Sequence, residues 1–358
     1  MLLSLLLIAV ILYVLQRYSM HKAIQHLTYR CELDRRCAES KEVFAVKSVL
    51  RNNGWFPLLY LHLREEMPRE TVFECEGQEG NRRTGMHMAD TVAEEVLYVL
   101  GRQQVIRTLH ISLAKRGRYL FGFSRITSGD FFGLDSHTVS FKSPQEVLIY
   151  PPRIDLSEWM PEVDDYLGEI SVQRFILPDP IETIGFREYT GREPMKQISW
   201  TKSLSAGQMI VRQFDHFSDL KACLLVNIEA GLPEEIEYIY SAARTLAEQL
   251  EKKHIPYSFY SNAFVVTSAV LSSHVESGNG DMHLQRVMEL LARATYEKTM
   301  RLERLLAQAA GSRDIQKAYL LMSASSVRKE VIQRFEQRYG IKILVLNGKE
   351  SHEHTETD

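Results

Sequence analysis

The sequence predicts a multi-domain protein in which an N-terminal transmembrane helix precedes a β-sandwich and a doubly wound α/β domain. Three observations predict this fold class. An uncharged apolar segment opens the chain, short strand-like runs separated by turn residues fill the first half, and apolar strands alternate with amphipathic helices in the second half. A chain of 358 residues is long enough for two domains of ordinary size.

The N-terminal apolar segment, Leu2–Leu15, contains no charged residue. The segment alone is short for the hydrocarbon core of a bilayer, but residues 16–18 can extend it. We therefore predict a transmembrane anchor in residues 1–18, of which 2–18 contact the lipid. A cleaved signal peptide would need a basic region before the apolar run. A helix buried in a globular core is also a poor fit, because this segment is apolar on every side. The positive charges all follow the segment: Arg17, Lys22, Arg30, Arg35 and Arg36. We therefore expect a single-pass protein of the cell membrane with its soluble domains in the cytoplasm.

Residues 24–150 have the pattern of a β-sandwich of the immunoglobulin type. The runs Val43–Leu50, Leu58–Leu63 and Val105–Leu113 are rich in β-branched and aromatic residues and alternate partly with period two. Turn residues such as those of Arg51–Gly54 separate the runs. Several short strands with regular turn signals indicate a sandwich.

Residues 151–184 are predicted to be a linker, and 185–346 the α/β domain. Five prolines and seven acidic residues in 151–180 favour an irregular connection. Beyond it we predict four strands, Ala222–Ile228, Pro256–Tyr260, Ala318–Met322 and Ile341–Leu346, and four helices, which begin at Pro233, Asp281, Leu302 and Ser326. Alternation of this kind predicts a mostly parallel, doubly wound sheet. The polar tail, 347–358, is predicted to be disordered.

Composition and motifs exclude several classes of function. A net charge of −3 argues against a basic nucleic-acid-binding protein. The four cysteines, Cys31, Cys37, Cys75 and Cys223, lack metal-ligand spacing and are predicted to be free thiols. The patterns G-x-S-x-G, H-E-x-x-H and Walker A are all missing. We predict no catalytic residue, no cofactor and no metal.

A conspicuous motif lies between Gly185 and Trp200. Its spaced residues are Arg187, Tyr189, Glu193, Lys196, Ile198 and Trp200. This spacing resembles the signature of the bacterial domain-of-unknown-function-58 family, R-x-Y-x-x-G-D-x-x-x-x-I-x-W. Glu193 replaces an aspartate and Lys196 a usual arginine, so the chain resembles a divergent member. The resemblance implies a von Willebrand factor A-like domain in 185–346 and partnership with a MoxR-type AAA+ ATPase. Members of the family commonly carry two neighbouring spans, so it is open whether an upstream span is missing from this sequence.

Three roles are open for the signature residues. Tyr189 and Trp200 each carry a large apolar ring with one polar atom, which suits structural anchoring of a loop. Arg187, Arg192 and Lys196 suit docking of a partner or an anionic ligand. The third role is catalytic, in a membrane-associated hydrolase that uses the loop around Arg187 and Glu193.

Von Willebrand factor A-type domains often bind a divalent ion through D-x-S-x-S after a central strand. The resemblance places Asn227, Glu229 and Gly231 at these positions. The leading carboxylate and both hydroxyls are replaced, so the chain is predicted to have a degenerate site without metal.

The function expected from these observations is that of a non-enzymatic, membrane-anchored interaction or scaffold protein. The resemblance implies that it works with a MoxR-type ATPase in the assembly or maturation of envelope or other protein complexes. A purely structural envelope component is a further alternative.

Overall fold

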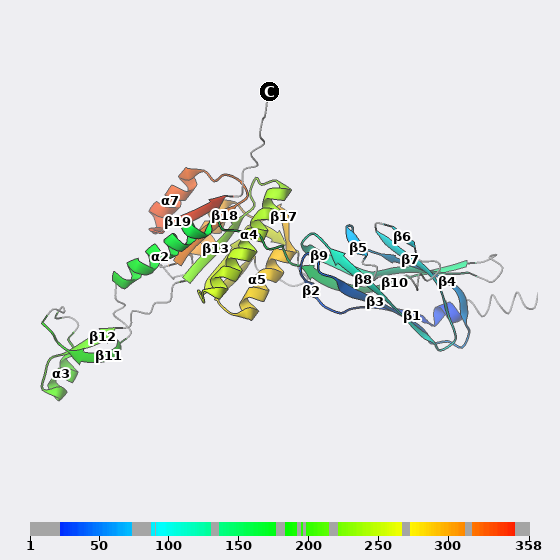
Figure 1. The fold of residues 1–358 in the computed structure, drawn as a ribbon, viewed down its shortest axis with the longest axis horizontal. Helices are drawn as coiled ribbons and strands as arrows, with labels where there is room; N and C mark the ends of the chain where they lie inside the picture. Colours follow the sequence, from blue (N-terminus) through cyan, green and yellow to red (C-terminus); the bar gives the residue numbers. More distant parts are fainter. Residues whose placement is uncertain are drawn as a thin grey trace, which may run out of the picture. The chain divides into compact units, whose positions relative to one another are not determined.

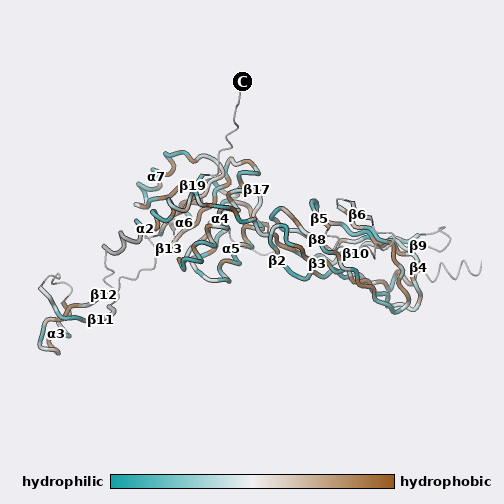
Figure 2. The backbone as a smooth tube through the Cα atoms, in the orientation of Figure 1, coloured by the Kyte–Doolittle hydropathy of each residue, from teal (hydrophilic) through white to brown (hydrophobic). Residues whose placement is uncertain are grey.

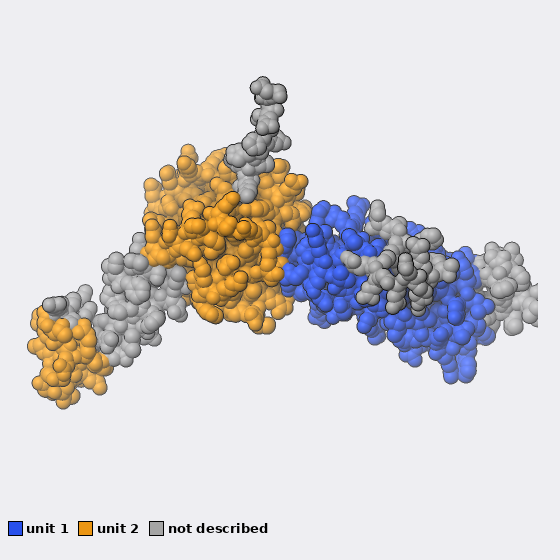
Figure 3. All heavy atoms as spheres, viewed as in Figure 1, with its two compact units in different colours: residues 1–152, 291–293 blue, residues 153–290, 294–358 orange. Residues whose placement is uncertain are grey.

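The computed structural model describes residues 22–73, 87–89, 91–129, 136–176, 183–191, 195, 198–214, 221–266, 273–311 and 317–347. The chain divides into two compact units, which Figure 3 shows in different colours. Unit 1 comprises residues 1–152 and 291–293, and unit 2 comprises 153–290 and 294–358. Each unit has its own sheets and its own core.

Unit 1 is built from two β-sheets (Figure 1). The four-stranded sheet has the order β1-β3-β8-β5, and the six-stranded sheet has the order β2-β10-β9-β4-β7-β6. The strands are β1 Leu27–Leu33, β2 Cys37–Ala38, β3 Phe44–Asn52, β4 Leu58–Glu66, β5 Thr71–Phe73, β6 His87–Ala89, β7 Val92–Val99, β8 Gln104–Leu113, β9 Gly117–Gly129 and β10 Ser136–Ile149. All ladders except the short β2–β10 pair are antiparallel.

The two sheets of unit 1 share one apolar interior because their strands alternate in burial. Along β3 every second side chain is buried, from Phe44 to Asn52, as period-two geometry requires. Phe44 meets Phe121 of the other sheet edge to face, with ring centroids 6.0 Å apart. A second cluster joins Leu50 of β3 to Leu61 and Leu63 of β4. This packing is that of a sandwich.

A β-bulge bends the longest ladder of this sandwich. The register of β9 against β10 shifts between Lys142 and Gln145. Opposite the bulge lies Gly122, whose φ is +92° and whose site would place a Cβ 1.9 Å from the Ser143 carbonyl oxygen. Only glycine fits such a close approach of two backbones.

Unit 2 contains a five-stranded sheet with the order β16-β14-β13-β18-β19. Its strands are β13 Lys221–Asn227, β14 Tyr257–Ser261, β16 His274–Gly278, β18 Lys317–Ser323 and β19 Ile343–Asn347. The ladders among β14, β13, β18 and β19 are parallel, and β16 pairs antiparallel at the edge. The apolar run of β13, which can be followed in Figure 2, is buried from Ala222 to Asn227, as expected for an interior strand.

The helices of unit 2 are α2 Met160–Ile176, α3 Trp200–Ala206, α4 Pro233–Lys252, α5 Asp281–Arg293, α6 Leu302–Ala310 and α7 Lys329–Tyr339. Two short antiparallel ladders lie outside the main sheet: β11 Thr183–Glu188 with β12 Ile210–Phe214, and β15 Ala263–Val265 with β17 Ala294–Lys298. The helix predicted from Pro233 buries the predicted apolar face: Ile236, Ile239, Tyr240, Ala243, Leu246 and Leu250. Helices α6 and α7 pack on strand residues that include Leu225 and Leu321.

The predicted fold class is wrong. Among the described residues, strands account for 45% and helices for 29%, so this part of the chain is mainly β-sheet. The doubly wound domain of von Willebrand factor A type is not evident, since unit 2 combines its sheet with an antiparallel edge strand and two separate ladders. These short strands carry many exposed polar residues, as in β16, and therefore gave no apolar periodicity from which to predict them.

The prediction of a single-pass membrane protein also needs correction. The predicted span, residues 1–18, lies outside the described residues. In the part of the chain that the structure describes, none of the helices combines the length and apolarity needed to cross a bilayer.

Residues 151–184 are not an irregular linker throughout, because α2 occupies Met160–Ile176. Pro161 stands at the beginning of this helix, where a missing N–H costs nothing. Val163 and Leu167 are buried, and the Tyr166 hydroxyl donates to the Lys342 carbonyl oxygen at 2.7 Å. The first part of α2 therefore belongs to the packed part of unit 2.

Candidate functional site

The strongest candidate site in unit 2 lies where three parallel strands end. Asn227 closes β13, Ser323 closes β18, and Asn262 directly follows β14. All three side chains are buried. Parallel strands bring their carboxyl ends to the same edge of the sheet, which is where open α/β sheets place ligands.

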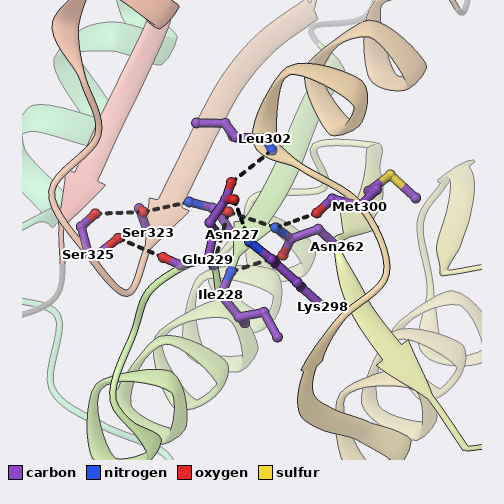
Figure 4. A network of polar contacts seen from close by, with 9 residues as sticks. All are labelled: Asn227, Ile228, Glu229, Asn262, Lys298, Met300, Leu302, Ser323 and Ser325. Atoms are coloured by element: carbon purple, nitrogen blue, oxygen red, sulfur yellow. Dashed lines mark hydrogen bonds and ion pairs between the residues drawn. The ribbon is translucent and has the colours of Figure 1, made fainter.

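These side chains form one hydrogen-bonded network (Figure 4). The Asn227 amide nitrogen donates to the Ser323 hydroxyl oxygen at 2.9 Å, and the Asn262 amide nitrogen donates to Asn227 Oδ1 at 2.7 Å. Asn262 Oδ1 accepts the Ile228 backbone N–H at 2.9 Å, and the Ser323 hydroxyl donates to the Ser325 carbonyl oxygen at 2.7 Å. The side-chain nitrogen and the side-chain oxygen of Asn227 thus both form hydrogen bonds within the protein.

Glu229 lies at the partly exposed rim of this network. Its carboxylate accepts hydrogen bonds from the Lys298 ammonium at 2.6 Å and from the Leu302 backbone N–H at 3.2 Å. The hydrogen bond from Lys298 is the main cause that holds the pKa of Glu229 below its ordinary value. The Ser325 hydroxyl also donates to the Glu229 carbonyl oxygen at 2.7 Å. Glu229 therefore ties the loop after β13 to α6 and to the loop after β18.

Gly231 has a packing role in this loop. A Cβ at this position would stand 2.4 Å from the Ala324 Cβ and 3.1 Å from Ile236 Cγ1. Any side chain here would push the loop after β13 away from the loop after β18. The glycine is explained by the close approach of the two loops.

The residues at this edge do not fit a divalent cation. Hard cations are held by several oxygen ligands, with carboxylates dominant. Here the one carboxylate, Glu229, is already neutralised by the ammonium of Lys298, and the Asn227 oxygen accepts from Asn262. Among the described residues there is no group of three or more His, Cys, Asp or Glu side chains arranged to hold a metal. The edge is a closed polar network.

The signature residues lie elsewhere, on a small element that we call the signature hairpin, residues 183–214. Its strands β11 and β12 pair antiparallel, with Arg187 opposite Val211. Ile198 is buried and bridges to Val211, and the Ser199 N–H donates to the Ile210 carbonyl oxygen at 2.8 Å. The Ser203 hydroxyl links α3 to β12, because it accepts a hydrogen bond from the Ile210 N–H at 2.8 Å.

The structure separates the signature residues by environment. Ile198 is buried, Tyr189 is half-buried, and Arg187 and Trp200 are exposed. Glu193 and Lys196 lie outside the described residues. The hypothesis of a hydrolase centred on Arg187 and Glu193 therefore stays a prediction.

Apolar side chains are exposed on the signature hairpin. Leu204 is 85% exposed and Trp200 is 55% exposed, although both belong to α3. No residue of α3 is buried. Phe186 and Met209, on and beside the two strands, are also exposed. A helix that buries none of its own residues gains little stability from packing, so these apolar groups are available for a partner.

Two of the described cysteines, Cys31 and Cys223, are poor candidates for a nucleophile. Cys31, Cys37 and Cys223 are free. Burial raises the pKa of Cys31 to about 12 and that of Cys223 to about 11. At neutral pH these two thiols stay protonated and unreactive.

Sequence reasoning missed Asn262, Lys298, Ser323 and Ser325. A signal was available for the serines and Asn262, since each comes at or just after the end of a predicted strand, where a parallel sheet gathers polar groups. Lys298 gave no such signal. It lies 69 residues from Glu229 in the sequence, and no local pattern joins them.

The chain matches no protein-family model and no curated protein sequence. Solved structures with partial likeness include native α2-macroglobulin from Escherichia coli, from domain MG7 to the C-terminus, which is 9% identical with a TM-score of 0.27. The match covers 35% of this chain and 23% of that one. A non-cellulosomal cohesin from Archaeoglobus fulgidus is 11% identical over 38% of this chain and 97% of its own, with a TM-score of 0.24. Likeness at this level carries no argument about fold or function.

Proposed function

We propose that this chain is a non-enzymatic protein-interaction or scaffold protein that works with a MoxR-type AAA+ ATPase in the assembly of protein complexes. The observation that carries the proposal is the set of exposed apolar side chains on the signature hairpin. Trp200 and Leu204 are the anchors of the proposed docking surface. Exposed aromatic and aliphatic groups of this kind are typical of the residues that dominate binding energy at interfaces.

Two further features support an interaction role over chemistry. The polar edge of the main sheet satisfies its own hydrogen bonds, as between Asn227 and Asn262, and so offers no free nucleophile or base. The two buried described thiols, Cys31 and Cys223, are protonated. The choice of a MoxR-type ATPase as the partner rests on the resemblance of the signature, from Arg187 to Trp200.

The test is direct binding between the purified chain and a purified MoxR-type ATPase from the same organism, measured by biolayer interferometry. We expect the double variant Trp200→Ala, Leu204→Ala to weaken binding at least tenfold, since loss of interface anchors costs about 2 kcal/mol or more. The unfolding midpoint should stay unchanged, because α3 has no buried residue.

Met282→Ala is the matched control. Met282 lies in α5 of the same unit and is 68% exposed, so its truncation removes a comparable apolar surface away from the hairpin. Binding that is equally weakened by the control, or wild-type binding that is undetectable at micromolar concentrations, would contradict the proposal.

A further inference from the structure

A second candidate binding site lies in unit 1, on the outer face of the six-stranded sheet. A cavity of about 490 Å³ is lined by three arginines, Arg64, Arg69 and Arg125, together with Glu66 and Met67. Arg64 and Glu66 come from β4, Arg125 comes from β9, and Arg69 comes from the turn between β4 and β5. The volume falls within the range of small-molecule sites, roughly 300–1,000 Å³.

Two of these arginines are direct cross-strand neighbours. Arg64 and Arg125 occupy opposed register positions on the antiparallel strands β4 and β9. Like charges placed directly opposite each other destabilise a sheet. On its other side Arg125 faces Ser140 of β10, so neither neighbour supplies a carboxylate. The pairing costs stability unless another group brings negative charge.

The remaining charges do not neutralise the cavity. The Arg64 Nε lies 3.3 Å from Glu94 Oε1, and the Arg64 side chain is half exposed. A guanidinium has five N–H donors, so this contact leaves most of the fork free. Within the described residues, neither Arg69 nor Arg125 is paired with a carboxylate. With Glu94 counted beside the lining carboxylate of Glu66, three guanidinium groups and two carboxylates leave a net charge of +1 (three minus two).

We propose that this cavity binds a small molecule through an oxyanion, a phosphate or a carboxylate group. Arginine forks match the geometry of both groups and hold them with paired, charge-assisted hydrogen bonds. An anion bound between Arg64 and Arg125 is attracted by both guanidinium groups, and its negative charge offsets the repulsion between them. Arg69 supplies a third set of donors from the turn. The apolar part of the ligand is expected to contact Met67, which lines the same cavity.

The experiment measures binding of two probes, inorganic pyrophosphate and citrate, to the full chain by isothermal titration calorimetry at low ionic strength. We expect Arg125→Gln to weaken binding of the preferred probe at least tenfold. The matched control is Arg30→Gln, which removes the same charge from an exposed position of β1 in the other sheet. The control should change the dissociation constant less than twofold.

The two probes distinguish the ligand chemistry. Binding of pyrophosphate alone supports a phosphate compound, binding of citrate alone supports a carboxylate, and binding of both supports general oxyanion recognition. No heat with either probe at millimolar concentration would overturn the proposal, as would equal losses in the Arg125→Gln and Arg30→Gln variants.

Thermal unfolding gives an independent measurement. Without added anion, Arg125→Gln relieves the repulsion with Arg64, so its midpoint should equal or exceed that of the wild type. With added probe, the midpoint should rise clearly in the wild type and less in the variant, because stabilisation by a ligand depends on how tightly the folded protein binds it. A similar rise in both proteins would contradict the assignment.

Discussion

One buried polar network in each unit can be compared, and the two networks differ in charge. In unit 1 the guanidinium of Arg107 bonds to Glu65 and lies 2.7 Å from the Glu95 carboxylate, and all three side chains are buried. The Tyr29 hydroxyl donates to Glu65 at 2.7 Å. Burial, aided by the charge of Glu65, raises the pKa of Tyr29, so the phenol stays a neutral donor. In unit 2 the buried network of Asn227, Asn262 and Ser323 is uncharged.

The difference corresponds to what each network connects. Arg107 belongs to the four-stranded sheet and Glu65 and Glu95 to the six-stranded sheet, so the charges join the two layers of the sandwich. The amides and hydroxyls of unit 2 instead hold together loops at one edge of one sheet. A buried charge without its partner costs far more than a buried amide without its partner. The two networks should therefore respond differently to the loss of one side chain.

The largest effect is expected from Arg107→Met. The variant leaves two carboxylates buried without a cation, which should lower the free energy of unfolding of unit 1 by about 3–5 kcal/mol. Urea unfolding, combined with hydrogen exchange of peptides from β8, measures the change and assigns it to unit 1. Arg51→Met is the matched control, since Arg51 is exposed in the same sheet. A loss below about 1 kcal/mol would show that the buried charges are not what holds the layers together.

A smaller effect is expected from Asn262→Leu in unit 2. The variant removes the partner of the Ile228 N–H and one of the two donors to Asn227 Oδ1, which also accepts the Glu229 N–H at 3.2 Å. Each buried group left unsatisfied costs about 1–3 kcal/mol. Hydrogen exchange should increase first in the loops after β13 and β18. The control is Asn279→Leu, at an exposed position of the same unit. If Asn262→Leu destabilises unit 2 as much as Arg107→Met destabilises unit 1, the distinction between the two networks fails.

The smallest effect concerns the rim pair of Glu229 and Lys298, and it depends on pH. Because Lys298 lowers the pKa of Glu229 in the folded protein, the pair stabilises the fold at pH values above the unfolded pKa, about 4.3. That contribution is lost as the pH falls through the folded pKa. The free energy of unfolding of the wild type should exceed that of Glu229→Gln by about 0.2–1 kcal/mol at pH 7, and this difference should shrink as the pH falls through the folded pKa of Glu229. A gap that widens on acidification would reverse the sign assigned here.

Much of the local structure could be predicted from the sequence. The helices from Pro233 and from Leu302 and the strand Ala222–Ile228 follow from apolar periodicity and agree with α4, α6 and β13. These elements owe their stability to a continuous apolar face, and that face is visible in the sequence. The spacing of Arg187 and Trp200 could also be recognised, although their exposure could not.

Other features have no local signal. Helix α2 was hidden by its proline-rich surroundings, because Pro161 marks a helix start as well as a break. Arg107 meets Glu65 across 42 residues, and Arg64 meets Arg125 across two strands whose register no composition reveals. Such contacts depend on the tertiary arrangement of strands, so the anion cavity and both buried networks became visible only in the structure.

The ammonium of Lys298 on Glu229 has one more consequence. This positive charge is covalently part of the chain, so it cannot be removed by a chelator or exchanged with the ions of the medium. At neutral pH the contact that holds the carboxylate of Glu229 therefore needs no magnesium or calcium from the medium.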